Sequence, residues 1–144
     1  FIGGNGEDAY VYYLKELSKD LIKKGKIKFL GYLKDQEVLD LYHATDLFML
    51  NSTNEGGPVS TIKALACEVP VFTTDVGHTA EVLKKEKAGV VVPIYNYNVW
   101  EEKLTEILKG KQVITLNRDT AHNHYDWNSI SKKFNNIYLS LENN

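Results

Sequence analysis

Short apolar runs alternate with longer amphipathic stretches along the whole chain, and no internal repeat or low-complexity linker interrupts them. The apolar runs predict strands, whereas apolar residues at three- and four-residue spacing predict helices. The predicted strands are 1–4, 27–31, 47–50, 69–73 and 89–92. The predicted helices are 8–24, a short one from Asp35, 58–67, 79–84, 99–108 and two in the C-terminal third, the last at about 126–141.

Strands that are separated by helices of this length require parallel crossovers. The order therefore predicts an α/β fold, a Rossmann-like doubly wound parallel sheet with helices on both faces and with 47–50 as a buried strand. Ligands of such sheets bind at the carboxyl ends of the strands. The informative residues are then expected in four loops, at 3–6, 31–34, 51–58 and 74–79.

The composition is that of one ordinary globular domain, with 144 residues, 43% hydrophobic and 25% charged side chains. Cys67 is the only cysteine, which excludes an intramolecular disulfide and favours a reducing, cytoplasmic location. The formal charge is -2 and Arg118 is the only arginine, so nucleic acid is not an expected partner. No apolar run approaches the roughly 18 residues that a membrane span needs.

The richest loop is 51–61, which runs from a predicted strand through Gly56 and Gly57 into the start of a helix. Glycines let a ligand approach the backbone closely, and the free amides of a first helical turn favour a phosphate. Glu55 can accept two hydrogen bonds from the hydroxyls of a polyol. The alternative is a helix cap and tight turn in which Glu55 only favours the helix dipole, and the loop by itself leaves both open.

The segment 54–77 reads NEGGPVSTIKALACEVPVFTTDVG and resembles the donor-binding signature of the family-4 (group 1) glycosyltransferases, which have the GT-B fold. Further matches flank it in the right order and extend the resemblance over nearly the whole chain. They are FIGGNGE at 1–7, FLGYL at 29–33, ATDLFML at 44–50, AGVVVP at 88–93 and YDW at 125–127.

The resemblance implies the C-terminal, nucleotide-sugar-binding domain of a retaining transferase that needs neither metal nor another cofactor. Such an enzyme transfers a hexose-type sugar to a glycan or a lipid-linked acceptor in polysaccharide biosynthesis. It works in the cytoplasm, where the full-length enzyme can associate peripherally with a membrane.

The resemblance also assigns roles to residues of the richest loop. Glu55 matches the first glutamate of the family's E-x7-E motif, which contacts hydroxyls of the donor sugar, and is the catalytic candidate. Gly57, Pro58, Val59 and Ser60 match the loop and helix start whose amides meet the diphosphate and the sugar.

Two other loops complete the implied donor site. Tyr32 and Leu33 match the segment that frames the nucleotide base. Gly3 and Gly4 belong to the match with the glycine turn at the carboxyl edge of the sheet.

Three residues depart from the family pattern. Lys63 stands where the second glutamate of the motif binds the ribose hydroxyls, and an ammonium group only donates hydrogen bonds. Lys63 is therefore a doubtful member of the base and ribose region, and a contact to a phosphate is one alternative. Glu68 replaces a helix-ending glycine, where a left-handed conformation is less comfortable. His78 replaces a glycine at the rim of the cleft, where an exposed loop histidine is expected more often than a sugar contact.

The resemblance further implies that residues 1–144 form a single truncated domain without its first strand-helix unit. The acceptor site and a catalytic histidine are expected in a separate N-terminal domain, toward which the last helix packs. The chain alone is then an inactive fragment. The alternative, suggested by Lys63, is a degenerate relative that binds a nucleotide or sugar, or serves as a scaffold, without catalysis.

Two weaker motifs suggest other ligands, a dinucleotide and a metal ion. Residues 4–9 satisfy the dinucleotide pattern G-x-G-x-x-A, but no acid precedes Asp35 at the end of the next strand, where a ribose ligand belongs. His122 and His124 lie near Asp126, but the i, i+2 spacing on a helix directs the two imidazoles apart. We therefore expect neither a dinucleotide cofactor nor a metal site.

Overall fold

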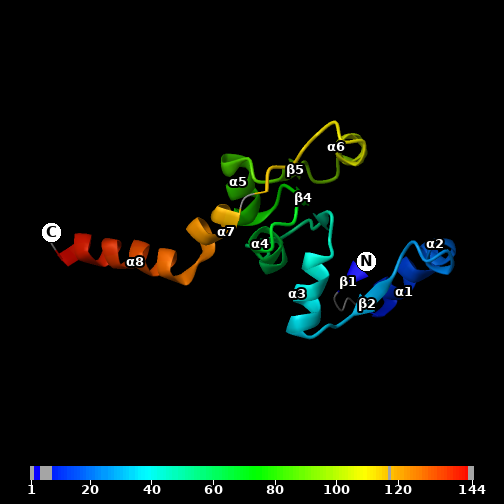
Figure 1. Ribbon diagram of the computed structural model, residues 1–144, viewed down its shortest axis with the longest axis horizontal. Helices are drawn as coiled ribbons and strands as arrows, with labels where there is room; N and C mark the ends of the chain where they lie inside the picture. The colour runs from blue at the N-terminus through cyan, green and yellow to red at the C-terminus, as the bar shows by residue number, and fades with distance from the viewer. Residues whose placement is uncertain (1, 4–7, 117, 143–144) are drawn as a thin grey trace. The chain divides into compact units, whose positions relative to one another are not determined.

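The computed structural model describes residues 2–3, 8–116 and 118–142 (Figure 1). The chain divides into two compact units, Phe1–Leu41 and Tyr42–Asn144, and each unit is described by itself. The predicted site residue Gly4 lies outside the described residues.

The first unit contains a short parallel pair of strands and two helices. Strand β1 (Ile2–Gly3) pairs with β2 (Phe29–Gly31), so that Gly3 is in register with Gly31. Helices α1 (Asp8–Leu17) and α2 (Lys19–Lys23) lie between them in sequence. Helix α3 (Asp35–His43) begins as predicted and crosses the boundary between the units.

The predicted single helix 8–24 is wrong in one respect, because it is interrupted at Ser18. The Ser18 hydroxyl donates to the Leu14 carbonyl oxygen at 2.6 Å. Such a bond from a serine side chain to the backbone competes with the regular hydrogen bonds of a helix and favours its interruption. The chain leaves the helical region at Gly25, whose φ of +66° is the left-handed conformation expected at a helix end.

The second unit is a three-stranded parallel sheet with helices on both faces. The strands are β3 (Phe48–Leu50), β4 (Val71–Thr74) and β5 (Val90–Val92), in the order β3-β4-β5. The helices are α4 (Val59–Ala66), α5 (Gly77–Glu86), α6 (Tyr97–Leu108), α7 (Arg118–Tyr125) and α8 (Trp127–Glu142). The parallel strands flanked by helices confirm the predicted α/β class.

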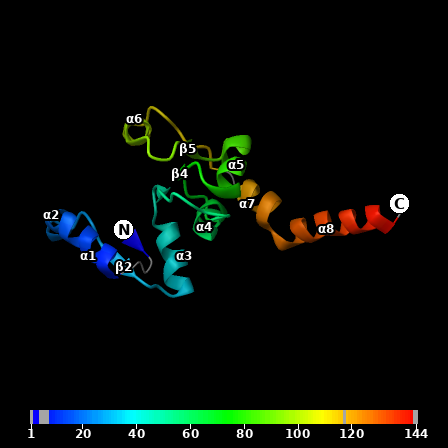
Figure 2. The same ribbon diagram turned by 180° about the vertical axis from the view of Figure 1, so that it is seen from behind.

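The central strand β4 is buried along its whole length and separates two hydrophobic clusters. On one face Val71 packs with residues of α4, α5 and α7, including Leu65 and Leu83. Figures 1 and 2 show these three helices close to β4. On the other face Phe72 packs on α6, with its ring edge-on to Trp100 at 4.7 Å between centroids. Adjacent side chains of one strand thus serve opposite layers, as the period of a strand requires.

The predicted burial of strand 47–50 is only partly met. The strand that forms there, β3, pairs with β4 on one side alone in the three-stranded sheet, and Met49 is 41% exposed. An outer strand receives side-chain cover from fewer neighbours than a central one, which accounts for the difference from β4.

The end of α4 is strained and braced at the same place. Glu68 has a φ of +57°, a left-handed conformation that costs a residue with a Cβ more than it costs glycine. The Arg118 guanidinium pairs with the Glu68 carboxylate at 2.9 Å, and its Nε donates to the Ala66 carbonyl oxygen at 3.1 Å. The only arginine of the chain therefore ties α7 to the end of α4.

Among the residues that the structure describes, no helix has the length and apolar character that crossing a membrane would demand.

We expect Arg118→Ala to lower the free energy of unfolding by about 1 kcal/mol, because an exposed ion pair and a bond to a helix-terminal carbonyl are lost. Glu68→Gly removes the left-handed strain together with the ion pair. It should therefore stabilise the chain by about 0.5 kcal/mol more in the Arg118→Ala background than in the wild type. Urea unfolding of the wild type, the two single variants and the double variant measures both changes in the free energy of unfolding. Strictly additive effects of the two substitutions would contradict the ion pair as a brace.

Candidate functional site

The candidate site is built on residues 51–58, which connect β3 to α4 and are called the site loop below. Glu55 is half-buried in this loop. The Ser52 hydroxyl donates to its Oε1 at 2.8 Å. The carboxylate is thus held by its own loop, and its other lone pairs stay available to a ligand.

The site loop is fastened to the turn between β4 and α5. Thr74 Oγ1 donates to the Ser52 carbonyl oxygen at 2.6 Å, and the His78 amide donates to the Gly56 carbonyl oxygen at 2.9 Å. A Cβ on Gly77 would lie 2.6 Å from the carbonyl oxygens of both Glu55 and Gly56. Only glycine permits this approach, and its φ of +66° favours glycine as well.

The first turn of α4 follows the site loop directly. Pro58 is the cap residue, and it offers neither an N–H nor a polar side chain, so α4 has no side-chain cap. The first turn also contains no acidic residue. Tyr42 Oη donates to the Ser60 carbonyl oxygen at 2.9 Å. This hydrogen bond uses the carbonyl group of Ser60 and not its amide. Open amides at the positive end of a helix dipole form a binding site for an anion.

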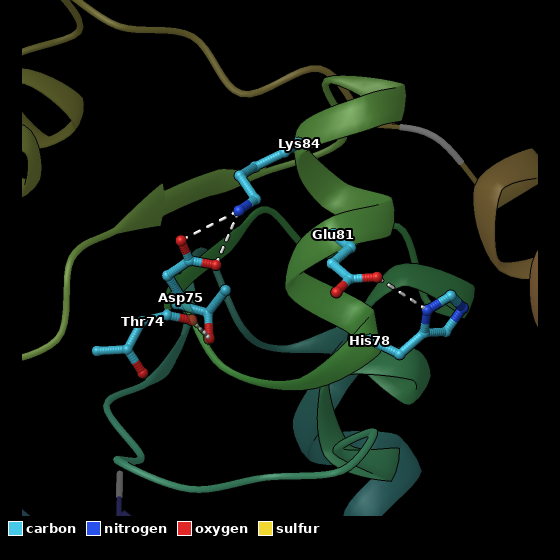
Figure 3. A network of polar contacts seen from close by, with 6 residues as sticks. Thr74, Asp75, His78, Glu81 and Lys84 are labelled. Carbon is cyan, nitrogen blue, oxygen red and sulfur yellow. Dashed lines mark hydrogen bonds and ion pairs between the residues drawn. The ribbon is translucent and has the colours of Figure 1, made fainter.

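The turn after β4 is tied to α5 by an exposed ion pair (Figure 3). Lys84 reaches both carboxylate oxygens of Asp75, at 2.9 and 3.0 Å. His78 Nδ1 lies 3.5 Å from Glu81 Oε2, and the His78 side chain is 63% exposed. The expected exposed histidine is therefore present, but it lies in the first turn of α5 instead of in a loop.

Two buried hydroxyl groups lie behind the site loop. Thr79 Oγ1 would be 3.9 Å from a Cβ on Gly57, and Thr79 is 1% exposed. Burial raises the pKa of the Tyr125 phenol, and the adjacent Thr79 hydroxyl acts in the opposite direction on that pKa. Neither hydroxyl has a hydrogen bond of good geometry within the described part of the chain.

The predicted site residues fall into two groups. Glu55 and residues 57–60 are contiguous and lie in the second unit, with Lys63 one helical turn beyond Ser60 on α4. The first unit holds Gly3, at the end of β1, and Tyr32 and Leu33, directly after β2. The Tyr32 side chain is 80% exposed, and Leu33 is half-buried.

Lys63 is exposed, and no ion pair joins it to an acidic side chain among the residues that the structure describes. Side chains of a helix lean toward its N-terminus. From a position one helical turn beyond Ser60, the long Lys63 side chain can reach toward the first turn of α4.

The described residues contain no group of three or more His, Cys, Asp and Glu side chains that could hold a metal ion. His124, which the sequence places near His122 and Asp126, instead lies 3.2 Å from the Glu86 carboxylate of α5.

Sequence reasoning did not single out Ser52 and Thr74. Both stand at the carboxyl ends of strands, within or at the edge of loops that were expected to be informative. Their hydrogen bond joins residues 22 apart in sequence. The position of each residue directly after a strand was the signal that could have indicated a role in the site. The hydrogen bond between them depends on the register of β3 and β4.

Residues 1–127 match the family model described as "Glycosyl transferases group 1". The chain belongs to this family, as the motifs predicted.

The sequence identity to two of the curated relatives is low. The chain is 25% identical to D-inositol 3-phosphate glycosyltransferase of Corynebacterium urealyticum, over 89% of this chain and 31% of that protein. It is 26% identical to N,N'-diacetylbacillosaminyl-diphospho-undecaprenol alpha-1,3-N-acetylgalactosaminyltransferase of Campylobacter jejuni, over 84% of this chain and 32% of the relative. The chain therefore spans about a third of the length of these curated relatives.

The fold also matches that of a solved protein structure. HepE of Anabaena, crystallised with UDP-glucose, superposes with a TM-score of 0.73 at 22% identity, over 96% of this chain and 40% of that chain. This similarity confirms the predicted GT-B architecture.

We expect Gly77→Ala to lower the free energy of unfolding by about 3 kcal/mol or more, since the methyl group meets two backbone carbonyls in addition to the conformational cost. Gly110→Ala is the matched control, because Gly110 has a φ of +67° with nothing within 4 Å of an added Cβ. It should cost only about 1 kcal/mol in the same urea unfolding experiment. Equal losses for the two variants would contradict the close approach.

Proposed function

We propose that the site loop and the first turn of α4 bind the sugar and diphosphate of a nucleotide-sugar donor. The observation that carries this proposal is the position of the Glu55 carboxylate, held by Ser52, next to a helix start that has no side-chain cap. A carboxylate accepts hydrogen bonds from sugar hydroxyls, and open helical amides favour the anionic diphosphate. The carboxylate thus suits the sugar, and the helical amides suit the diphosphate, on the two sides of the bond that a glycosyltransferase breaks.

In this proposal Glu55 orients the donor sugar, and the amides of Gly57, Val59 and Ser60 stabilise the charge that develops on the departing diphosphate. Helix amides are oriented before the reaction begins, so they stabilise that charge without reorganisation. We further propose that the sugar is transferred with retention of configuration. The transfer needs no metal ion in this proposal, because the helix start supplies the positive potential.

The finer assignments concern the whole protein. We propose a hexosyltransferase whose acceptor is a glycan or a lipid-linked sugar, as the name of the Campylobacter relative indicates for that protein. The acceptor site is placed in a part of the protein outside these 144 residues, so that this chain alone does not turn over. The exposed apolar side chains of α8, which include Phe134, Tyr138 and Leu141, are proposed to pack against that part.

Lys63 is proposed to supply positive charge to the diphosphate. Its position in the family is that of a ribose-binding carboxylate, and an ammonium group cannot accept the hydrogen bonds of a diol. No described acidic side chain pairs with Lys63, so its charge is available to an anionic ligand.

Isothermal titration calorimetry with UDP-glucose, UDP, GDP-mannose and GDP tests the donor site in this chain. We expect Glu55→Ala to weaken binding of the preferred nucleotide-sugar about tenfold, because bonds to a charged acceptor are lost, and to change free-nucleotide affinity less than about twofold. Glu102→Ala, an exposed carboxylate on α6, is the control and should change neither affinity.

Two results would count against this function. No binding of any of the four ligands at about millimolar concentration would contradict the donor site. Equal losses of nucleotide-sugar and free nucleotide in Glu55→Ala would contradict the sugar contact alone.

We expect Lys63→Glu to weaken the preferred nucleoside diphosphate about tenfold and to flatten the dependence of its Kd on salt concentration, because an attractive charge becomes repulsive. Lys63→Arg keeps the charge and should retain most of the affinity. Titrations at low and high salt measure both effects. Tighter binding by Lys63→Glu would instead favour a site that this chain no longer uses.

A further inference from the structure

We infer that Ser52 is a positioning residue for Glu55 and that Thr74 holds Ser52 in place. The inference rests on the donor-sugar role proposed for Glu55, and it adds the reason why that carboxylate has a defined direction.

The contact between Ser52 and Glu55 has a fixed polarity. The distance from Ser52 Oγ to Glu55 Oε1 is 2.8 Å, and an ionised carboxylate can only accept. The serine hydroxyl must therefore donate its single proton to the hydrogen bond with Glu55. A bond to a charged acceptor is among the stronger hydrogen bonds of proteins, which suits it to select one conformation of a long side chain.

Ser52 is itself anchored to the core of the second unit. Thr74 is 5% exposed, and its hydroxyl donates to the Ser52 carbonyl oxygen at 2.6 Å. The Leu50 carbonyl oxygen is 3.5 Å from the same hydroxyl, too long to compete for its one proton. Thr74 ends β4, which is paired on both sides, so the anchor belongs to the best-supported strand of the sheet.

The backbone of Glu55 is restrained independently. Gly77 lies against the carbonyl groups of Glu55 and Gly56, and the His78 amide donates to Gly56. These contacts fix where the Glu55 side chain begins but leave its three side-chain torsions free. Ser52 is the described group that restrains the far end of this side chain, and without it the carboxylate would lose rotamer entropy on binding a sugar.

The first experiment measures the preference of the chain for UDP-glucose over UDP by calorimetry. We expect Ser52→Ala to reduce this preference about tenfold while UDP affinity changes less than about twofold. Ser52→Thr retains the hydroxyl and should retain the preference. Thr115→Ala, which removes an exposed hydroxyl between α6 and α7, is the control and should have no effect.

A double-mutant cycle separates positioning from a direct contact between Ser52 and the sugar. If Ser52 acts through Glu55, then Ser52→Ala changes the preference no further in a Glu55→Ala background. A second, independent loss in that background would overturn the positioning role.

A readout without ligand decides the inference even if the proposed function fails. Three-bond scalar couplings of the Glu55 side chain, measured by NMR, report whether one rotamer dominates. We expect one rotamer in the wild type and in Ser52→Thr, and averaged values in Ser52→Ala and Thr74→Val. Absence of nucleotide binding with these couplings as expected would overturn the donor function only, whereas unchanged couplings in a folded Ser52→Ala would overturn the positioning role.

Discussion

The site loop takes its shape from one close approach of backbone to backbone. Gly77 lies so near the carbonyl groups of Glu55 and Gly56 that no side chain fits between them. The His78 amide then reaches the Gly56 carbonyl oxygen, and the start of α5 is fixed against the loop that leads into α4. A loop of polar residues has no hydrophobic face with which to fold, so its conformation must be imposed by neighbours that are themselves part of the core.

Two of the left-handed positions of this unit, Gly77 and Glu68, differ in how the chain accommodates the conformation. At Gly77 the strain is avoided, because glycine adopts positive φ without cost and also yields the space. At Glu68 the strain is accepted, and Arg118 braces the residue from another helix. A substitution at Gly77 therefore disturbs the site, whereas one at Glu68 affects stability at the other end of α4.

Most elements of the fold could be predicted because their signals are local. The buried run that became β4 and the proline before α4 are visible within a few residues, and the site residues from Glu55 to Ser60 are contiguous. Contacts between distant residues could not be predicted in this way. The bond from Thr74 to Ser52 and the ion pair of Arg118 depend on strand register and helix packing, which no short window of sequence encodes.

The charge reversal at Lys63 costs helix α4 little. Lys63 is in the last turn of this eight-residue helix, where a positive charge interacts favourably with the helix dipole. A carboxylate at the same place would lie at the unfavourable end of the dipole, so a glutamate there needs a ligand or a neighbour to justify it. The replacement thus leaves the fold unaffected, and its consequences fall on whatever binds at the start of α4.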